Sequence, residues 1–434
     1  MREDWDTAIS GEILDIRDGT HDTPKYVEEA VHPLVTSKNL KNGVIDLSNV
    51  KYISNDSFQE INKRSKVDIG DVLFAMIGTI GNPVVITLEP NYSIKNVGLF
   101  KNVYNVINSK LLGYYLDSLN FYSQLEKRQF LKGTTQKFIP LGHLRKLEIP
   151  IAPLPEQRAI VAKIEELFSD LDKGIADLKK AQDQLVIFRQ AVLKKAFEGE
   201  LTNSTSNMQT ISFGDEIKIV SGNTPKGLKG ISNEGNHQFY KVSDMNLPGN
   251  EVDMKSSNLK LTKDEIERLK VKIFPKGTII FPKRGGAILT NKKRILSKDA
   301  SFDLNVMGVI PNENYLSKYL YYFFISLDLG KICDGTAVPQ INNKHIAPLV
   351  FPKCTVDIQS MIVQEIEFRL SVCDKVEQSI AESLDKAKAL RQSILKKAFD
   401  GTLLSEDEIA ACKAEKDYEP ASILLKKIKA EKKK

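Results

Sequence analysis

The segment PLPEQRAIVAKIEELFSDLDKGIADLKKAQDQLVIFRQAVLKKAFEGEL, residues 153–201, decides the fold because the chain writes much of it a second time. Its end, FRQAVLKKAFEGEL, is identical to LRQSILKKAFDGTL of residues 390–403 at nine of fourteen positions, at an offset of 202 residues. At the same offset GTTQKFIPLGHLRKLEIP, from Gly133, matches GTAVPQINNKHIAPLVFP, from Gly335, without a gap. The protein is therefore a tandem duplication in which a variable globular part precedes a more similar segment.

Each repeated segment is predicted to be a helix of roughly 40 residues. The PLP sequence stops the preceding element, Glu156 suits a first helical turn, and Gly199 suits a C-cap. Apolar residues recur at steps of three and four, the heptad pattern of a coiled-coil seam, although Arg369 and Ser383 interrupt the second copy. The seam residues are Ile164, Leu167, Leu171, Gly174, Leu178, Ala181, Leu185, Phe188 and Val192, and then Ile366, Cys373, Val376, Ile380, Ala387, Leu390 and Ile394.

Two such stripes in one chain most simply bury each other, and the gapless repeat predicts helices of equal length. If the two helices pair antiparallel, the pair has an approximate two-fold axis across its middle. In that arrangement the globular parts stand at opposite ends and match two half-sites on opposite strands of a duplex, at a separation set by helix length. Because the globular copies have diverged, the half-sites need not share a sequence. The alternative is that each helix packs on its own globular neighbour as an ordinary core helix.

The globular parts are predicted to mix helices and strands. Strand candidates are DVLFAMI and NPVVITL in the first copy, and GTIIFP and NVMGVI in the second. The helix candidates KLLGYYLDSLNFYSQLEKR and LSKYLYYFFISLDL follow them. The predicted fold class is therefore α+β: two mixed α/β domains joined by two long antiparallel coiled-coil helices, with pseudo-two-fold symmetry.

Composition limits the possible functions. With 27% charged residues among 434, and no apolar run near the ~18 residues that span a bilayer, the chain is predicted to be cytoplasmic. Its start, MREDWDTAIS, lacks the apolar core of a signal peptide. A net charge of +6 permits nucleic-acid binding without requiring it. Cys333, Cys354, Cys373 and Cys412 have no CxxC spacing, which favours reduced structural cysteines over a zinc site.

The loops of both globular parts hold side chains suited to DNA. Arg and Lys neutralise phosphates or reach guanine edges, and Asn and Gln pair with adenine. For any single Lys a solvated surface is the better interpretation, whereas for the NKKR and PQINNK loops together the two interpretations are balanced. The predicted DNA-binding residues are Thr20, His21, Lys25, Lys63, Arg64, Lys66, Gln136 and Lys137 in the first copy, and Lys226, Lys229, Lys283, Arg284, Asn291, Lys292, Lys293, Arg294, Gln340, Asn342, Asn343 and Lys344 in the second.

No catalytic motif is visible in the sequence. NPPY-like and DPPY-like methyltransferase motifs are missing, and GNTPKGLK, from Gly222, has Leu228 where a phosphate-binding loop needs Lys. KRGGA, from Lys283, is interpreted as a turn. His143 and His345 hold equivalent positions without a Cys, Ser or acidic partner in a recognisable motif, so a structural role is preferred for both.

This organisation resembles the specificity subunit of type I restriction-modification systems. LPEQRAIVAKIE and LKKAF.G.L carry the resemblance, supported by GTTQKF and GTAVPQI, and it extends to about Leu403. It implies target recognition domains at 1–153 and 203–352, spacer helices at 154–202 and 353–403, and a C-terminal basic tail at 404–434. KCTVDIQS replaces PLPEQR before the second helix, where only Gln359 matches Gln157, so the entry of that helix stays open.

The resemblance implies a non-catalytic subunit that binds double-stranded DNA, reads an asymmetric bipartite target and positions two modification subunits, with restriction subunits as further partners. Adenine methylation with S-adenosylmethionine and ATP-dependent cleavage would belong to those partners. Cofactors, Mg included, are therefore expected on the partner subunits, with neither a cofactor nor a metal on this chain. The expected partner-binding surface is the pair of apolar helix ends, predicted to be left unpaired by the helix pair, at Leu193, Phe197, Leu201, Leu395, Phe399 and Leu403.

The tail after Leu403 has no counterpart in the duplication. Six lysines among its last nine residues most simply predict a disordered arm, and a weak contact with DNA or with a partner is the alternative. A second class of function also stays open, in which the chain is a coiled-coil scaffold whose globular ends bind proteins. Under that hypothesis the basic and amide-rich loops have no reason to face one common groove.

Overall fold

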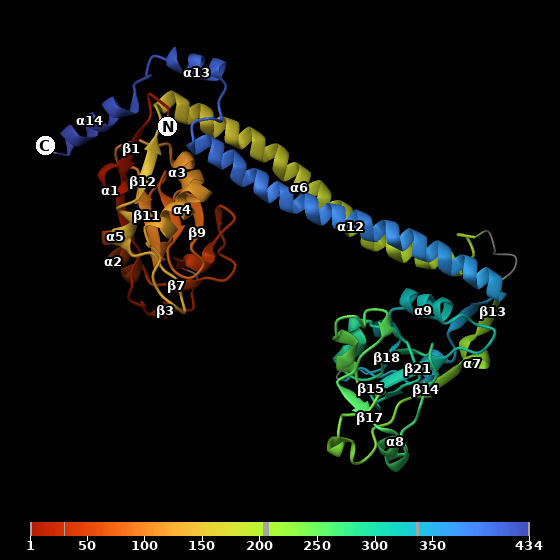
Figure 1. Ribbon diagram of the computed structural model, residues 1–434. Helices are drawn as coiled ribbons and strands as arrows, with labels where there is room; N and C mark the ends of the chain where they lie inside the picture. The colour runs from red at the N-terminus through yellow and green to blue at the C-terminus, as the bar shows by residue number, and fades with distance from the viewer. Residues whose placement is uncertain (1, 30, 203–207, 336–337, 433–434) are drawn as a thin grey trace. The chain divides into compact units, whose positions relative to one another are not determined.

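The computed structural model describes residues 2–29, 31–202, 208–335 and 338–432. Unit 1 comprises residues 1–178 and 382–434, and unit 2 comprises residues 179–381 (Figure 1). Each unit contains one globular domain together with part of each of two long helices. Each unit therefore has a hydrophobic core of its own.

The globular domain of unit 1 is built from short strands. They are β1 Asp6–Ile9, β2 Asp15–Asp18, β3 Tyr26–Val27, β4 His32–Thr36, β5 Leu40–Lys41, β6 Val44–Ile45, β7 Lys51–Ile53, β8 Val72–Ala75, β9 Gly81–Val85, β10 Ser93–Lys95, β11 Val97–Lys101 and β12 Glu148–Ile151. One antiparallel sheet has the order β2-β11-β8-β9, and a second sheet has the order β10-β4-β7-β3 with β10 parallel to β4. β1 pairs with β12, which leads into the first long helix.

The short helices of unit 1 are α1 Ser10–Ile13, α2 Asn55–Ser65, α3 Ser109–Leu116, α4 Leu119–Lys127 and α5 Leu141–Leu144. α3 and α4 replace the single helix expected over 110–128. The cause is Ser118, whose hydroxyl donates to the Tyr115 carbonyl and accepts the Phe121 N–H, so that it caps α4.

Unit 2 repeats this plan with different lengths. Its strands are β13 Gln209–Ser212, β14 Lys218–Ser221, β15 His237–Tyr240, β16 Asp253–Met254, β17 Leu259–Leu261, β18 Ile279–Pro282, β19 Arg294–Leu296, β20 Ser301–Phe302, β21 Val306–Ile310 and β22 Val350–Lys353, and its short helices are α7 Phe213–Glu216, α8 Lys263–Leu269, α9 Ser317–Ser326, α10 Leu329–Ile332 and α11 Asn343–Ile346. The sheet order β14-β21-β18-β19-β16 repeats β2-β11-β8-β9 and adds one strand. β13 pairs with β22 as β1 pairs with β12.

The two long helices, α6 Leu154–Phe197 and α12 Val356–Phe399, have 44 residues each. In unit 1, Arg391 near the end of α12 lies 3.0 Å from Asp172 in α6. In unit 2, Arg189 near the end of α6 lies 2.7 Å from Asp374 in α12. These residues correspond at the offset of 202, so the contacts are reciprocal and the helices run antiparallel in both units. The predicted class of mixed domains with two long antiparallel helices is confirmed.

A buried glutamine fixes the start of each long helix. Its amide donates to two backbone carbonyls and accepts one backbone N–H, so all three bonds tie the helix to the preceding domain. The partners are Val106, Ala152 and Asn108 for Gln157, and Asn314, Cys354 and Leu316 for Gln359. This equivalence explains why α12 starts at Val356 although most of the PLPEQR motif is missing there.

The heptad seam is closed at some positions and open at others. Ile164, Val192, Ile366, Cys373, Ile380, Ala387 and Ile394 are buried as predicted. Gly174, Phe188, Val376 and Leu390 are exposed. Residues 174 and 376 are equivalent in the repeat, as are 188 and 390, so the seam opens at matching places in both copies. Gly199 has φ +79°, which confirms the predicted C-cap of α6.

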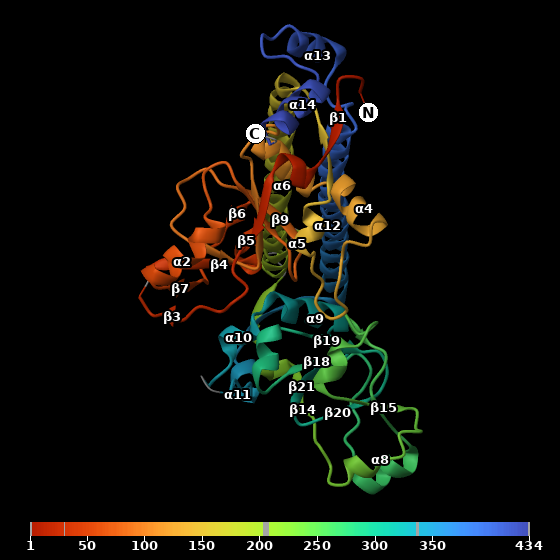
Figure 2. The same ribbon diagram turned by 90° about the vertical axis from the view of Figure 1, so that its left-hand side faces the viewer.

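The prediction that the tail is a disordered arm is wrong for its described residues. It forms α13 Glu406–Lys413 and α14 Ala421–Glu431, and α14 lies beside the N-terminal strand β1 (Figures 1 and 2). The Tyr418 hydroxyl donates to Asp4, Arg158 pairs with Asp417 at 2.9 Å, and Leu425 is buried. The lysines of α14 alternate with buried apolar residues, and burial of that apolar face offsets the entropy of ordering the segment.

Candidate nucleic-acid interface

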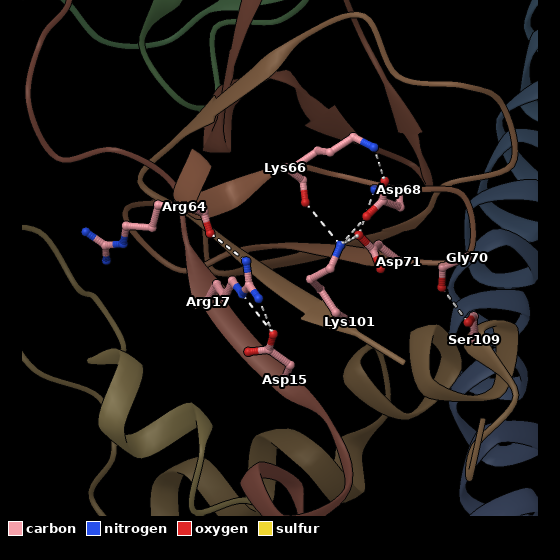
Figure 3. A network of polar contacts seen from close by, with 9 residues as sticks. All are labelled: Asp15, Arg17, Arg64, Lys66, Asp68, Gly70, Asp71, Lys101 and Ser109. Carbon is pink, nitrogen blue, oxygen red and sulfur yellow. Dashed lines mark hydrogen bonds and ion pairs between the residues drawn. The ribbon is translucent and has the colours of Figure 1, made fainter. Parts of the chain in front are cut away.

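The basic segment at the end of α2 presents Lys63 and Arg64 of its last turn and the C-cap residue Lys66 to solvent, with side chains 73%, 61% and 61% exposed. Side chains of two neighbouring strands hold its backbone by hydrogen bonds (Figure 3). Arg17 donates from Nη1 to the Arg64 carbonyl over 2.9 Å, and Lys101 donates to the Lys66 carbonyl over 3.0 Å. The three predicted DNA-binding residues therefore project from a fixed turn.

The predicted residue His21 lies beside Arg64 because both contact Asp18. His21 Nε2 lies 2.8 Å from the Asp18 carboxylate, which also accepts a hydrogen bond from Arg64. Asp18 is buried at the end of β2 and is followed by Gly19, where a Cβ would lie 2.4 Å from the Ile94 carbonyl oxygen. Gly222 of unit 2 is equally confined, at 2.2 Å from the Asp303 carbonyl oxygen, so the close approach of these backbones requires glycine in both copies.

The Gln136 and Lys137 side chains stand on an exposed loop that is pinned to the end of β8. Phe138 forms β-bridges with Ile77 and Lys132, and the Gly78 N–H donates to the Lys137 carbonyl over 2.9 Å. The loop starts at Gly133, where φ is +88°. We call this arrangement of residues 132–138 against 77–78 the loop clamp of unit 1.

Unit 2 has an equivalent loop clamp, formed by residues 334–335 and 338–340 against residues 284–285. Gln340 forms β-bridges with Arg284 and Asp334, and the Gly285 N–H donates to the Pro339 carbonyl over 2.9 Å. Lys283 Nζ donates to the Ser221 hydroxyl over 3.1 Å, and partial burial together with the charge of Arg284 lowers the pKa of Lys283. The structure thus brings Lys283, Arg284 and Gln340 together, although they are far apart in the sequence.

The predicted NKKR cluster is mostly structural. Lys293 is fully buried and donates to the Asn291 side-chain oxygen over 2.6 Å and to the Leu327 carbonyl over 2.7 Å, and burial lowers its pKa to about 8. Asn291 also accepts the Leu329 N–H, and Arg294 donates to the Lys293 and Met245 carbonyls. The DNA-contact prediction is wrong for Lys293, because its ammonium has no path to a duplex. Lys292, bonded to the Asn246 side chain, is partly exposed.

The remaining predicted residues lie in loops or short helical turns and are exposed or partly exposed. Lys25 precedes β3, and Lys226 and Lys229 flank Gly227, where φ is +94°. Lys344 pairs with Asp334 at 2.5 Å, which attaches the start of α11 to the loop clamp of unit 2. Asn342, Asn343 and Thr20 are exposed or partly exposed.

The apolar helix ends are packed into the globular domains. Phe399 contacts Tyr115 of α3 with ring centroids 5.2 Å apart, and Phe197 contacts Tyr319 of α9 at 5.3 Å. Leu193, Leu395 and Phe399 are buried, and Leu201 and Leu403 pack against the same two cores. The expectation of unpaired side chains is therefore wrong here, because an aromatic residue of each domain covers the repeated LKKAF motif.

Neither histidine of the repeat stands in a recognisable catalytic arrangement. His143 stacks on Phe130 with ring centroids 4.6 Å apart and contacts the Phe130 carbonyl through Nδ1. His345 accepts the Asn342 N–H and lies 2.9 Å from Asp334. Within the described residues, no cluster of His, Cys, Asp and Glu is arranged to hold a metal ion, and no helix is long and apolar enough to cross a membrane.

Sequence reasoning missed the residues that hold these loops. Arg17, Lys101 and Asp71 act through backbone carbonyls and buried pairs, which no motif spells out. Lys95 was missed as well, although its Nζ donates to the His21 and Asp22 carbonyls and to Thr23 at 2.7 Å. No motif in the sequence marks Lys95, which is the last residue of β10.

Comparison with known proteins agrees with this geometry. The model for the type I restriction modification DNA specificity domain matches residues 2–180 and 205–371. The EcoKI specificity subunit of Escherichia coli K12 is 24% identical over 94% of this chain and 90% of its own length. The StySPI specificity subunit of Salmonella potsdam is 22% identical over 99% and 96%.

Solved structures share the fold. A chain from work on complex assembly and conformational transition of the type I R-M system superposes with a TM-score of 0.71, at 18% identity over 92% of this chain and 98% of that chain. The HsdS subunit from Thermoanaerobacter tengcongensis superposes with a TM-score of 0.57, at 17% identity over the same shares.

Two mixed domains with duplicated loop clamps and two long antiparallel helices define a class of two-domain DNA-recognition proteins. The chain belongs to the type I restriction modification DNA specificity family. The predicted DNA-recognition class is confirmed at this level, and the scaffold alternative is not favoured.

Proposed function

We propose that this chain is the DNA-reading subunit of a type I restriction-modification complex, that it is itself non-catalytic, and that it acts in the cytoplasm. The domain of unit 1 reads one half of an asymmetric bipartite target, and the domain of unit 2 reads the other half. The observation that carries the proposal is the loop clamp built in both units. One clamp presents Gln136 and Lys137, and the other presents Arg284 and Gln340. The same backbone arrangement therefore presents different side chains to DNA in the two units.

The two helices of equal length set the spacing between the half-sites in this proposal. Two modification subunits methylate adenine with S-adenosylmethionine, and restriction subunits supply ATP-dependent cleavage. Mg, ATP and S-adenosylmethionine reside on those partners.

Exposed apolar side chains on the helices of unit 2 support a protein partner there. Met361, Phe368 and Val372 recur along one face of α12, and Phe368 is 65% exposed. Their equivalents in unit 1 are Ala159, Glu166 and Asp170. We assign this face, in place of the buried LKKAF motif, to contact with a modification subunit.

Methylation sequencing tests the proposal. The chain is co-expressed with the modification subunit of its own system, and methylated adenines are mapped across the host genome. We expect one split motif that is lost without this chain and that changes in one half only when residues 1–150 are exchanged for those of a relative. Methylation indifferent to the chain would contradict the proposal.

A paired substitution tests the footprint in unit 2. Replacing Lys283 and Arg284 by Glu is expected to weaken DNA binding and to reduce the slope of log affinity against log salt by about two units, because a phosphate that the protein no longer neutralises keeps its counterions. An unchanged slope would remove both residues from the interface.

A further inference from the structure

Backbone contacts, rather than side-chain packing, hold the basic segment of unit 1 in place. The carbonyls of Arg64 and Lys66 accept hydrogen bonds from Arg17 and Lys101, while the side chains of the segment stay exposed (Figure 3). Ser65, between them, is buried and donates to the Ile61 carbonyl. The last turn of α2 is therefore fastened to other strands at Arg64 and at Lys66, while Ser65 between them bonds within the helix.

The two fastening cations are themselves fixed by carboxylates. Arg17 donates from Nε to Asp15 over 2.8 Å, from the same strand β2. Lys101, only 11% exposed, donates to Asp68 over 2.8 Å and to Asp71 over 2.7 Å as well as to the Lys66 carbonyl. Three acceptors occupy all three N–H donors of its ammonium, so Lys101 has one fixed geometry.

The carboxylates of this group also have fixed places. Asp71 accepts the Asp68 N–H over 2.8 Å, and Asp71 is buried at the start of β8. Ser109, at the start of α3, donates to the Gly70 carbonyl over 2.5 Å. The polar group therefore ties the turn to β2, β8, β11 and α3 together.

We propose that Arg17 and Lys101 are positioning residues for DNA binding. By fixing the backbone of the last turn of α2 and of its C-cap residue, they hold the basic side chains of Lys63, Arg64 and Lys66 in one arrangement before DNA arrives, without touching DNA themselves. Ordering a flexible segment on binding costs affinity, and prior fixation removes that cost. The inference rests on the proposed function of the domain.

Unit 2 provides an internal comparison for this device. Strand register places Thr278 of unit 2 where unit 1 has Asp71, and Ile310 where unit 1 has Lys101. Val220 stands opposite Gly308 as Arg17 stands opposite Leu99. The polar group therefore belongs to the first domain alone, and its loss is expected to affect the half-site of unit 1 alone.

The test uses the full chain purified with its modification partner and a fluorescent duplex carrying the motif mapped by methylation sequencing. Affinity is measured over a series of KCl concentrations for Lys101→Met, Lys66→Met and the double variant. We expect Lys101→Met to weaken binding about tenfold. The double variant is expected to lose less affinity than the sum of the two single losses, because part of the effect of Lys101 passes through Lys66. Additive losses with an unchanged salt slope would overturn the proposal.

A second variant covers the risk that Lys101→Met leaves Asp71 unpaired and disturbs folding. Arg17→Met frees the Arg64 carbonyl but leaves only the partly exposed Asp15 behind, so the fold is retained. Lys101→Arg keeps the charge and the donors and is expected to restore much of the affinity. The matched control is Lys110→Met, which breaks an exposed pair with Glu165 in the same unit and should not change affinity.

The outcomes separate this inference from the proposed function. If Lys66→Met weakens binding but Arg17→Met and Lys101→Met do not, the positioning role is overturned and the DNA footprint stands. If Lys66→Met, Lys63→Met and Arg64→Met all leave affinity unchanged, the footprint of this segment fails and the inference fails with it. A change in base preference confined to the half of the motif read by unit 1, in Arg17→Met, would support the positioning role over a merely structural one.

Discussion

The two units keep one set of contacts and have changed another. Gln157 and Gln359 make equivalent sets of three hydrogen bonds. Asp172 and Asp374 each form an ion pair with the arginine near the end of the opposite helix. Around the basic segment, by contrast, unit 1 has a buried ionic group where unit 2 has Thr278 and Ile310.

The difference shows how a duplicated chain separates assembly from recognition. Contacts that attach a long helix to its domain must work in both copies, because the two helices have the same length and pair with each other. In the proposed function the exposed loops of the two units read two different half-sites, so the contacts that support those loops are free to diverge. We therefore expect the same substitution at Gln157 and at Gln359 to have equal effects on the stability of the two units. Equivalent substitutions in the exposed loops of the two units are expected to have unequal effects.

The largest effect is expected where the units differ most, at the tail. Ending the chain at Leu403 removes the buried Ile409, Leu425 and Ile428 and leaves buried Glu156 without the Tyr418 hydroxyl. The loss of that apolar burial is expected to lower the stability of unit 1 by about 5 kcal/mol. Hydrogen exchange followed by mass spectrometry should show faster exchange in unit 1 and unchanged exchange in unit 2.

A single-atom control separates the tail's packing from its hydrogen bonds. Tyr418→Phe removes only the hydroxyl that bonds Asp4 and Glu156 and should cost about 1–2 kcal/mol. A truncated chain that exchanges as slowly as the full chain would show that the tail contributes nothing to unit 1.

The helix anchors are expected to give matched losses. Gln157→Leu and Gln359→Leu each leave three backbone groups without a partner in a buried place, at a cost of about 3 kcal/mol. Each variant should accelerate hydrogen exchange in its own unit by the same factor. A loss in one unit only would break the equivalence drawn from the repeat.

Buried Lys293 predicts a pH dependence confined to unit 2. Burial lowers its pKa to about 8, against about 10.4 in the unfolded chain, so between these values the unfolded state binds more protons. The stability contributed by Lys293 therefore grows as pH rises through this window, by up to about 3 kcal/mol, and is constant below it.

Lys293→Met should remove that rise. The measurement is urea unfolding of unit 2, followed by hydrogen exchange, at several pH values between 7 and about 10. Lys292→Met, at the partly exposed neighbour, is the control and should keep the wild-type slope. Parallel pH profiles for wild type and Lys293→Met would show that the buried ammonium does not titrate in this window.

The long-range plan of the fold could be predicted from the sequence because its signals are periodic or repeated. The heptad steps predicted α6 and α12, and the gapless offset predicted their equal lengths, whereas their antiparallel pairing was a hypothesis that the family resemblance supported. The folding of the tail could not be predicted in this way. Its charged partners, Asp4 and Arg158, lie more than 250 residues away in sequence, and a lysine-rich segment by itself indicates disorder.

The candidate site was predictable only in part. The corresponding sequences GTTQKF and GTAVPQI contribute residues to the two loop clamps, and each clamp lies near the end of a predicted strand, DVLFAMI or GTIIFP. Whether a given lysine faces solvent was not predictable. Lys292 and Lys293 are neighbours in one basic run, yet Lys293 is fully buried and Lys292 is partly exposed. Burial of Lys293 depends on the Leu327 carbonyl, which the chain supplies 34 residues later.

The smallest predicted effect concerns the reciprocal ion pairs, and it sharpens the comparison most. Arg391 meets Asp172 at 3.0 Å and also lies 3.9 Å above the Phe168 ring, whereas Arg189 meets Asp374 and Glu377 and has Leu370 at the position equivalent to Phe168. Exposed ion pairs contribute roughly 0–1 kcal/mol, and a cation over a ring adds about 0.5–1 kcal/mol. Arg391→Met should therefore cost more stability than Arg189→Met.

Charge reversal distinguishes the two contributions. Arg189→Asp with Asp374→Arg should recover most of the loss of either single change, because that pair is mainly ionic. Arg391→Asp with Asp172→Arg should recover less, because the reversed pair no longer places a guanidinium over Phe168. High salt should remove the ionic part in both units and leave the ring contribution in unit 1. Equal recovery in the two units would show that the Phe168 contact adds nothing, and that the helix pair is as symmetric in energy as it is in sequence.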